Sequence, residues 1–366
     1  MPRKLEPDYK ILIYTVALII IGMVMIYSSS GTLAGHRYGD PAHFLKRQII
    51  WAVLGGMGMA AAMRFDYHRL ARYAAWVYIA AILLLFLVLV PAFSREVGGA
   101  RRWLVVGGFT FQPAEFAKLA LIIFFSAFLV KKESVGKLKD FITGYMPNAF
   151  ALGICFVLIL LQPDMGTSLI LAVVVFTLFF ISGIRTSYIA GTLLMLLPFI
   201  YAAIVMVDYR KKRLLSFLNP WADPFNSGFQ IIQSYVAFGN GHIAGLGLGG
   251  SMQKNYFLPD AHTDFIFSII GEEIGFIGCT IVVALFAALV YRGFKVAYRA
   301  PEPFGMYLAT GITINIGLQA VVNIGVATGM LPTKGLPLPF ISLGGSALVI
   351  WMISIGMLLN VSEHTN

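Results

Sequence analysis

The sequence predicts an all-α integral membrane protein with about ten transmembrane helices and a long extracytoplasmic loop between the seventh and eighth spans. Charged residues form only 12% of the 366 residues and hydrophobic residues form 58%, whereas about 25% of a typical soluble domain is charged. The apolar residues also gather in stretches close to the roughly 20 residues that a helix needs to cross a bilayer. This composition excludes disordered and nucleic-acid-coating proteins, so no nucleic-acid partner is expected.

Ten apolar stretches follow one another along the chain. They lie near residues 10–28, 45–63, 73–92, 113–130, 144–161, 167–183, 188–207, 265–290, 304–329 and 344–361. Each is expected to be a helix, because lipid offers no hydrogen-bond partner to an exposed backbone. The whole chain, 1–366, is therefore expected to be a single polytopic membrane domain. Cys155 and Cys279 each lie inside an apolar stretch, where a thiol acts as a small hydrophobe.

Basic residues in the short loops orient the spans. They follow the second, fourth and eighth stretches, and with the basic N-terminus they mark the cytoplasmic side under the positive-inside rule. These residues are Arg64, Arg69, Arg72, Lys131, Lys132, Lys137, Lys139, Arg292, Lys295 and Arg299. Both termini are therefore expected in the cytoplasm. Of the 27 Lys and Arg residues, 14 lie on inner segments and 13 on the outer side, which is more than this rule explains.

The long outer loop, 208–264, is expected to contain structure of its own, because a structureless loop of that length is unusual. Residues 208–218 are basic and then apolar, which suits a helix lying at the headgroup boundary. Residues 229–238 form a plausible short amphipathic helix. The glycine-rich piece 239–250 is not expected to bind a nucleotide, because no strand precedes it and no βαβ unit surrounds it.

Four polar segments lie on the expected outer side, at or beside the ends of spans. Their polar residues include Glu115, Lys118, Asp164, His262, Thr263, Asp264, Lys334, Ser342 and Ser346. Charged side chains at bilayer depth are costly and usually face a cavity or one another. The four segments therefore predict a polar pocket that opens to the outer leaflet.

Several of these acids also have a purely structural interpretation. Glu115 and Asp164 stand beside prolines at helix starts, where acids favour the positive end of the helix dipole. Glu115 and Lys118 are three residues apart and can pair on one helix face. Asp264 is different, because Thr263 could cap the helix by itself and leave a carboxylate at the edge of an apolar run. Desolvation there would raise the pKa of Asp264, which suits a group that accepts a proton near neutral pH.

Other chemistries lack support in the sequence. Glu272 and Glu273 lie two turns deeper than Asp264 and are interpreted as buried structural acids. The six histidines show no paired metal-ligand spacing, so no protein metal site is expected. Neither a Gly-x-Ser-x-Gly elbow nor a Walker loop occurs, which argues against a serine hydrolase and an ATP-driven pump.

These segments resemble the SEDS family (shape, elongation, division and sporulation) of peptidoglycan glycosyltransferases over nearly the whole chain. The motifs that carry the resemblance are Gly99-Ala-Arg-Arg102-Trp103-Leu, Phe111-Gln-Pro-Ala-Glu115-Phe-Ala-Lys118, Gln162-Pro-Asp164-Met-Gly-Thr, Pro259-Asp-Ala-His262-Thr-Asp264-Phe and Pro337-Leu-Pro-Phe-Ile-Ser342-Leu-Gly-Gly-Ser346. The stretches 213–224 and 331–335 look more like the division branch than the elongation branch. One departure is Leu343, where many members carry Tyr.

The resemblance implies polymerisation of lipid II into β-1,4 glycan strands at the outer face of the bacterial cytoplasmic membrane, during cell division or cell-shape maintenance. Asp264 matches the family's essential aspartate and is assigned as general base. Arg102, Lys118 and Lys334 are candidates for stabilising the leaving pyrophosphate. Glu115 and Asp164 would position these cations or the sugars. His262, Thr263, Ser342 and Ser346 complete the predicted substrate-binding set.

The resemblance also implies partners, namely a class B penicillin-binding-protein transpeptidase, other divisome or elongasome proteins, and membrane lipid. No cofactor is certain, although a divalent cation, Mg²⁺ or Mn²⁺, could accompany the pyrophosphate. Two other functions stay open. A lipid II flippase or transporter would explain the spans and the polar pocket equally well, but it needs no general base at Asp264. A non-catalytic divisome scaffold would tolerate changes to the outer charges.

Overall fold

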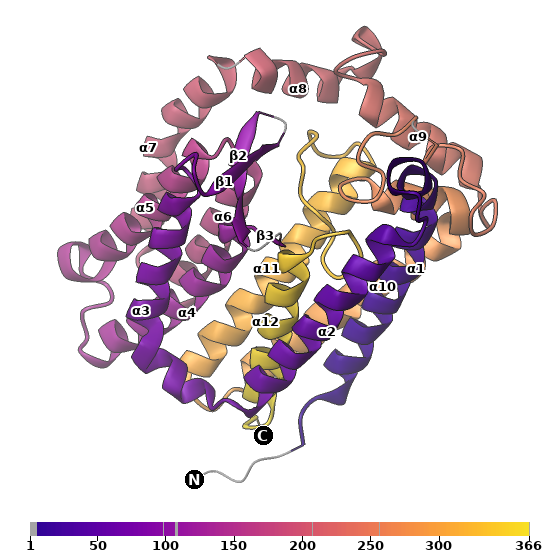
Figure 1. The fold of residues 1–366 in the computed structure, drawn as a ribbon. Helices are drawn as coiled ribbons and strands as arrows, with labels where there is room; N and C mark the ends of the chain where they lie inside the picture. The colour runs from indigo at the N-terminus through magenta and orange to yellow at the C-terminus, as the bar shows by residue number, and fades with distance from the viewer. Residues whose placement is uncertain (1–5, 98, 107–108, 207, 256, 366) are drawn as a thin grey trace.

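The computed structural model describes all residues except 1–5, 98, 107–108, 207, 256 and 366, so the basic residues Arg3 and Lys4 used for orientation lie outside the described part. Ten helices lie where the ten spans were predicted (Figure 1). They are α1 (Tyr9–Tyr38), α2 (His43–Arg64), α3 (Tyr67–Leu87), α4 (Pro113–Ser134), α5 (Met146–Leu161), α6 (Met165–Ile181), α7 (Thr186–Val205), α10 (Ile266–Arg299), α11 (Pro303–Ala327) and α12 (Ser346–Ser362). A π-helical turn, η1 (Phe141–Tyr145), leads into α5.

Length and hydropathy support a membrane-spanning bundle. Within the described residues, six helices are long and apolar enough to cross a membrane by themselves, and α6, α12 and the first part of α7 are shorter apolar helices. The remaining span, α2, packs closely on α12. A Cβ added at Gly55 would meet Met352 Sδ at 2.5 Å, and one at Gly58 would meet Ile353 Cγ1 at 2.8 Å. Small residues at such a crossing let two membrane helices approach closely.

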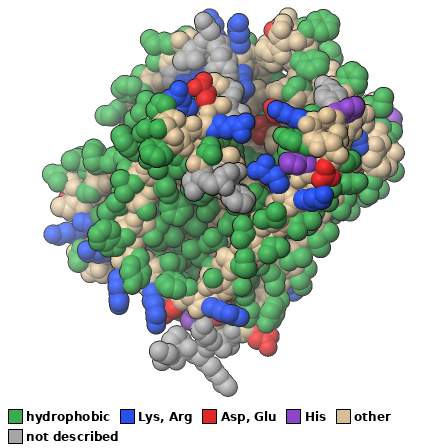
Figure 2. All heavy atoms as spheres, in the orientation of Figure 1, with side chains coloured by type: hydrophobic (Ala, Val, Ile, Leu, Met, Phe, Trp, Pro, Cys, Tyr) green, Lys and Arg blue, Asp and Glu red, His purple; other side chains and the backbone are tan. Residues whose placement is uncertain are grey.

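The two ends of the bundle differ in what they carry. At one end the N–H of Asp8 donates to Ser362 Oγ at 3.0 Å, and the Asp8 carboxylate pairs with Arg292 of α10 at 2.5 Å. Asp8 and Ser362, near the two ends of the described chain, therefore lie together at this end of the bundle; Figure 1 shows the opposite ends of α1 and α12 directed away from it. The opposite end carries a small sheet and the helices of the long loop. Figure 2 shows charged and histidine side chains gathered at this second end, above a mostly hydrophobic belt.

The long loop contains the two helices predicted for it. They are α8 (Asp208–Leu218) and α9 (Phe229–Gly241), and a 3-10 turn, η2 (Pro220–Ala222), lies between them. In Figure 1, α8 runs across the top of the bundle between α7 and α9. The side chains of Arg213, Ser216 and Phe217 are buried or half-buried, whereas those of Lys211, Lys212, Leu214 and Leu215 are exposed. Arg210 is half-buried as well, so the helix turns two of its basic residues inward.

The sheet was not predicted from the sequence. Strands β1 (Ser94–Val97), β2 (Ala100–Val106) and β3 (Phe109–Phe111) pair antiparallel in the order β1-β2-β3, with Arg95 opposite Trp103. The third predicted span also ends earlier than expected, because α3 stops at Leu87. The sheet leads directly into α4 and thereby places Arg102 of β2 above the bundle.

Helix α10 is interrupted near its N-terminal end by a segment of the long loop. Gly275 has φ 73°, a left-handed value that an L side chain rarely adopts. Residues 242–247 lie against this break. The N–H of Leu246 donates to Glu272 O at 3.0 Å, and the N–H of Phe276 donates to His242 O at 3.0 Å. Backbone pairing thus replaces the helical hydrogen bonds that the break removes.

Candidate active site

Asp264 lies in a tight turn that ends where α10 begins. The carbonyl oxygen of Asp260 accepts hydrogen bonds from the N–H groups of Thr263, Asp264 and Phe265 at 3.1, 3.1 and 3.3 Å. Asp260 itself has φ 55°, a conformation that Asp tolerates better than most residues. The turn fixes the backbone of Asp264 but supplies no hydrogen bond to its carboxylate from any described residue.

Burial and neighbouring charges set the acidity of Asp264. Its side chain is half-buried. The pKa of the Asp264 carboxyl is raised to about 7. Burial is the main cause, the carboxylates of Asp260 and Asp164 also raise the pKa, and the guanidinium groups of Arg213 and Arg102 lower it. A carboxyl group with a pKa near 7 can exchange a proton at physiological pH.

The loop between α11 and α12, residues 328–345, packs against the Asp264 turn. Ser342 Oγ donates to Thr263 O at 2.5 Å and accepts from the N–H of Leu338 at 2.8 Å. The N–H of Leu343 donates to His262 O at 3.1 Å. Ser342 is fully buried, so its hydroxyl holds the two segments together, and a direct contact between Ser342 and substrate remains a prediction.

Gly335 and Lys334 of the same loop lie beside Asp264. A Cβ added at Gly335 would lie 2.8 Å from Asp264 Oδ2, so any side chain there would press on the carboxylate. Burial lowers the pKa of the Lys334 ammonium, and the Asp164 carboxylate opposes that shift. Within the described residues, no carboxylate lies within ion-pair distance of Lys334. A half-buried cation therefore lies near the proposed base.

Arg102 and Asp164 come together from different elements. The Arg102 side chain on β2 donates from Nε to Gln162 O at 3.2 Å and from Nη2 to Pro163 O at 2.5 Å. These carbonyls close the α5–α6 turn that carries Asp164. Asp164 caps α6, because its carboxylate accepts from the N–H and the hydroxyl of Thr167 at 3.1 and 2.9 Å. Because these hydrogen-bond acceptors are uncharged carbonyl groups, they do not neutralise the positive charge of Arg102.

Glu115 and Lys118 lie in the interior of the bundle. Lys118 Nζ pairs with Glu115 Oε1 at 2.8 Å, and the two side chains are 2% and 1% exposed. Lys118 Nζ also donates to Gln319 Oε1 at 2.5 Å. These partners compete with the predicted contact between Lys118 and a substrate anion, which stays a prediction. The geometry favours a supporting role for the pair.

The other predicted residues surround this centre. Ser346 begins α12, and its Oγ accepts from the N–H of Gln112 at 3.1 Å. Thr263 Oγ1 donates to Asp260 O at 3.2 Å within the turn. The half-buried His262 ring lies 5.3 Å from the Phe44 ring, centroid to centroid, and burial lowers the pKa of His262. His262 is therefore mostly uncharged at neutral pH.

Sequence reasoning did not assign four residues that the structure places at this site. Arg213 of α8 donates from Nη1 to Thr333 O at 3.2 Å. Gly335 contacts Asp264, and Gln319 and Asn323 of α11 hydrogen bond to the surrounding loops. Arg213 stood in a basic run that suggested only a membrane surface. The two amides lay inside an apolar stretch, where their polarity was the available signal.

Glu272 and Glu273 form a separate buried cluster. The Glu272 carboxylate accepts from the hydroxyl of Ser251, from the N–H groups of Met252 and Gln253 at 3.3 Å each, and from Asn240 Nδ2 at 3.2 Å. Glu273 pairs with Lys254 at 2.8 Å and accepts from Ser28 Oγ at 2.6 Å. Buried acids that are satisfied in this way hold the glycine-rich loop on α10, as their structural interpretation predicted.

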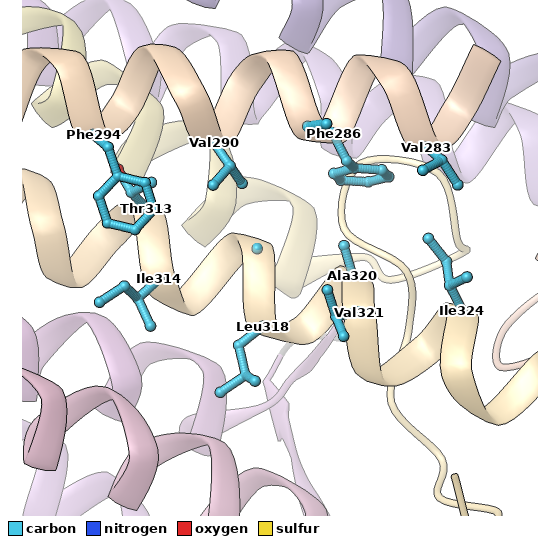
Figure 3. A pocket seen from close by; sticks show the side chains of 12 residues that line it. Val283, Phe286, Val290, Phe294, Thr313, Ile314, Leu318, Ala320, Val321 and Ile324 are labelled. Atoms are coloured by element: carbon cyan, nitrogen blue, oxygen red, sulfur yellow. The ribbon is translucent and has the colours of Figure 1, made fainter. Parts of the chain in front are cut away.

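An apolar groove elsewhere in the described part of the bundle offers no acid–base chemistry. A groove between α10 and α11 is lined by apolar side chains such as Phe286, Val290 and Leu318, and Thr313 supplies its one polar side chain (Figure 3). Among the described residues, no group of three or more His, Cys, Asp or Glu side chains could hold a metal ion. The described residues therefore offer no ready-made ligand set for Mg²⁺ or Mn²⁺.

Known proteins resemble this chain over almost its full length. The family model described as cell cycle protein, covering FtsW, RodA and SpoVE, matches residues 9–366. A probable peptidoglycan glycosyltransferase FtsW from Geobacter metallireducens is 48% identical over 98% of this chain and 95% of its own. Stage V sporulation protein E of Bacillus subtilis is 40% identical over 99% of both chains.

Solved structures agree with these matches. A peptidoglycan synthase complex that coordinates polymerisation and crosslinking contains a chain with a TM-score of 0.78 and 30% identity, over 97% of both chains. Thermus thermophilus RodA, a rod shape determining protein, gives 0.72 and 28%, over 97% of this chain and 96% of its own. The chain therefore belongs to the FtsW, RodA and SpoVE family, the SEDS proteins, and is more similar to FtsW than to the other two.

Proposed function

We propose that this protein polymerises lipid II into glycan strands at the outer face of the bacterial cytoplasmic membrane; its FtsW relatives are named as probable peptidoglycan glycosyltransferases. The observation that carries the proposal is the state of Asp264. Its carboxylate is half-buried, receives no hydrogen bond from a described residue, and lies among cationic side chains at one end of a membrane bundle. The first and last described segments, at Asp8 and Ser362, lie at the other end, which we assign to the cytoplasm.

The proposed reaction is a substitution at the anomeric carbon of the donor sugar. Ionised Asp264 takes the proton of the 4-hydroxyl of an acceptor GlcNAc, and that oxygen attacks C1 of the donor MurNAc. The bond between C1 and the pyrophosphate oxygen breaks, and undecaprenyl pyrophosphate leaves. Attack opposite the leaving group inverts C1 and produces a β-1,4 link.

The leaving pyrophosphate needs cations that are not already neutralised. Arg102 donates to carbonyl groups, and Lys334 has no described carboxylate within ion-pair distance. We therefore assign both to the pyrophosphate, where fixed positive charge stabilises the charge that develops on bond breaking. Glu115 and Lys118 neutralise each other in the interior and support the surrounding helices. A Mg²⁺ or Mn²⁺ ion, whose chemistry is to neutralise pyrophosphate, would have to enter with the substrate.

The similarity to a chain of a peptidoglycan synthase complex extends the proposal to partners. We propose that a class B penicillin-binding-protein transpeptidase crosslinks the strands that this protein makes. The similarity to FtsW favours assembly with division proteins over elongation proteins. Depletion of the protein should then produce filaments, whereas a role in elongation would produce spheres.

The test is reconstitution of the purified protein in vesicles with labelled lipid II, with and without the transpeptidase partner. The proposal predicts glycan chains from the wild type and none from folded Asp264→Ala protein. Movement of lipid II across the vesicle membrane without chain growth would replace the proposal by a flippase. Absence of both activities, with binding of the partner retained, would identify a scaffold.

A further inference from the structure

Two side-chain amides of α11 hold the backbone on both sides of the proposed active site. Asn323 Nδ2 donates to Asp264 O at 2.9 Å and to Leu336 O at 2.7 Å. One turn earlier, Gln319 Nε2 donates to Pro337 O at 3.1 Å. Gln319 is 0% exposed and Asn323 is 1% exposed. A single helix thus binds the segment that carries the base and the loop that packs against it.

The hydrogen bonds fix which way the Asn323 amide points. Both protons of its Nδ2 are used by carbonyl oxygens from two different segments. Its Oδ1 is buried without a hydrogen-bond partner among the described residues. A flipped amide would place Oδ1 against two carbonyl oxygens, which is repulsive, so the observed orientation is the one that the acceptors select. Asn323 therefore makes both donor contacts while its Oδ1 is left without a hydrogen bond from a described residue.

The hydrogen bonds from Asn323 and Gln319 hold a segment of the loop that has no regular secondary structure. Residues 331–338 form neither helix nor strand, and Leu336 is buried. A carbonyl group buried there must find a donor from elsewhere in the protein, because leaving it unpaired is costly. The amides of α11 supply that donor at two successive residues, directly after Gly335.

The position of Gly335 matters because it limits where the Asp264 carboxylate can lie. Its Cα hydrogens face Asp264 Oδ2, and a Cβ there would be 2.8 Å from that oxygen. Gln319 also accepts from Lys118 Nζ, which pairs with Glu115. A continuous set of contacts therefore runs from α4 through α11 to the loop beside the base. The buried Glu115–Lys118 pair can therefore support the position of this loop without contacting substrate.

We propose that Asn323 and Gln319 are positioning residues, which set the distance and orientation between the Asp264 carboxylate and the loop that carries Lys334. The proposal rests on the proposed function, because it assigns these amides to the same reaction. A misplacement of about 1 Å at a reacting group can slow a reaction on the order of 100-fold. Loss of either amide should therefore lower kcat more than it changes KM.

Asn323→Leu is the main variant, and Asn315→Leu is its matched control. Asn315 lies two turns away on α11, is 5% exposed and has a buried Oδ1 without a partner, so the control removes an equally buried amide that holds no loop. Gln319→Glu is a second variant. Glutamate at this position keeps an oxygen that accepts from Lys118 but cannot donate to Pro337 O. Gln319→Glu is the milder variant, to be used if Asn323→Leu does not fold.

The experiment measures lipid II polymerisation in reconstituted vesicles together with hydrogen exchange of residues 333–342 without substrate. We expect Asn323→Leu to lower kcat between about tenfold and 100-fold, to leave KM within about threefold, and to speed exchange in this loop. Asn315→Leu should change neither. Wild-type kcat in folded Asn323→Leu, or an equal loss of kcat in Asn315→Leu, would overturn the proposal. Wild-type protein that makes no glycan would instead overturn the proposed function.

Discussion

The fold treats two groups of acids near the start of α10 in opposite ways. The carboxylates of Glu272 and Glu273 are fully buried and accept hydrogen bonds from Ser251, Lys254 and neighbouring backbone. The Asp264 carboxylate is half-buried, and no described group donates a hydrogen bond to it. A satisfied carboxylate stabilises structure, whereas an unsatisfied one is held ready for another proton or ligand. The difference separates the acid that we assign to chemistry from the acids that hold a loop.

Replacement of Asp264 should produce the largest functional loss. Asp264→Asn preserves the size of the side chain but removes the base, so we expect kcat for lipid II polymerisation to fall on the order of 1000-fold. Glu272→Gln, nearly two turns inside the helix that follows Asp264, should lower the melting temperature and leave the activity of the folded fraction unchanged. If Asp264→Asn and Glu272→Gln lost similar activity per folded molecule, the assignment of only Asp264 to catalysis would be contradicted.

The buried cluster should dominate stability. Lys254→Met leaves Glu273 without its cation in a site where the two side chains are 7% and 0% exposed. We expect the free energy of unfolding to fall by about 3–5 kcal/mol. The exposed pair Lys46–Asp40 provides the control, since Lys46→Met should cost at most about 1 kcal/mol. Denaturation of both variants in detergent measures this difference, and equal losses would contradict it.

Neighbouring arginines of β2 provide a matched test of the anion site. Arg102 donates to Gln162 O and Pro163 O, whereas Arg101 pairs with Glu96 at the surface. Arg102→Gln should reduce kcat/KM for lipid II by about 100-fold, because it removes a cation from the leaving group. Arg101→Gln removes the same charge from the same strand and should change kcat/KM by less than about twofold. If the two substitutions had the same effect, general surface charge would explain the result.

A methyl group beside the base should have a smaller effect. The Cβ of Gly335→Ala would lie 2.8 Å from Asp264 Oδ2, so the carboxylate has to shift, and we expect kcat to fall about tenfold. Gly191→Ala in α7 adds the same methyl group where no atom lies within 4 Å. Steady-state kinetics of both variants measure the difference. Full activity of folded Gly335→Ala would show that the loop does not constrain Asp264.

The spans could be predicted from the sequence because each of them is an apolar run of nearly the required length. The sheet could not, because short strands containing Arg95, Arg101 and Arg102 resemble a polar loop. Asp264 was identifiable from its place before a long apolar helix. The hydrogen bonds from Ser342 to Thr263 and from Lys118 to Gln319 could not be predicted, because these partners lie far away in the sequence. Asn323 and Gln319 were missed for the same reason, since only the fold brings the carbonyl groups to them.

Dependence on pH tests the central claim about Asp264 most directly. The pKa of about 7 predicts that kcat/KM for lipid II rises through an inflection near pH 7, because only ionised Asp264 accepts the proton. His262, whose pKa is lowered by burial, should already be mostly neutral there. The groups that act on Asp264 are Asp260, Asp164, Arg213 and Arg102. Arg102→Gln removes an opposing charge and should move the inflection to higher pH.

Protonation of Asp264 should also affect the free energy of unfolding, which should fall as the pH rises, whereas kcat/KM should increase. The folded-state pKa of Asp264 lies above the ordinary value of 3.8, so this contribution to stability is complete below that value, is lost as the pH rises from 3.8 to about 7, and is constant above. Asp264→Asn should remove this loss. The deciding measurement is the pH profile of kcat/KM for wild-type protein and Arg102→Gln. We predict an inflection near pH 7 that moves upward in the variant, whereas a profile that is flat between pH 5 and 9 would contradict the account.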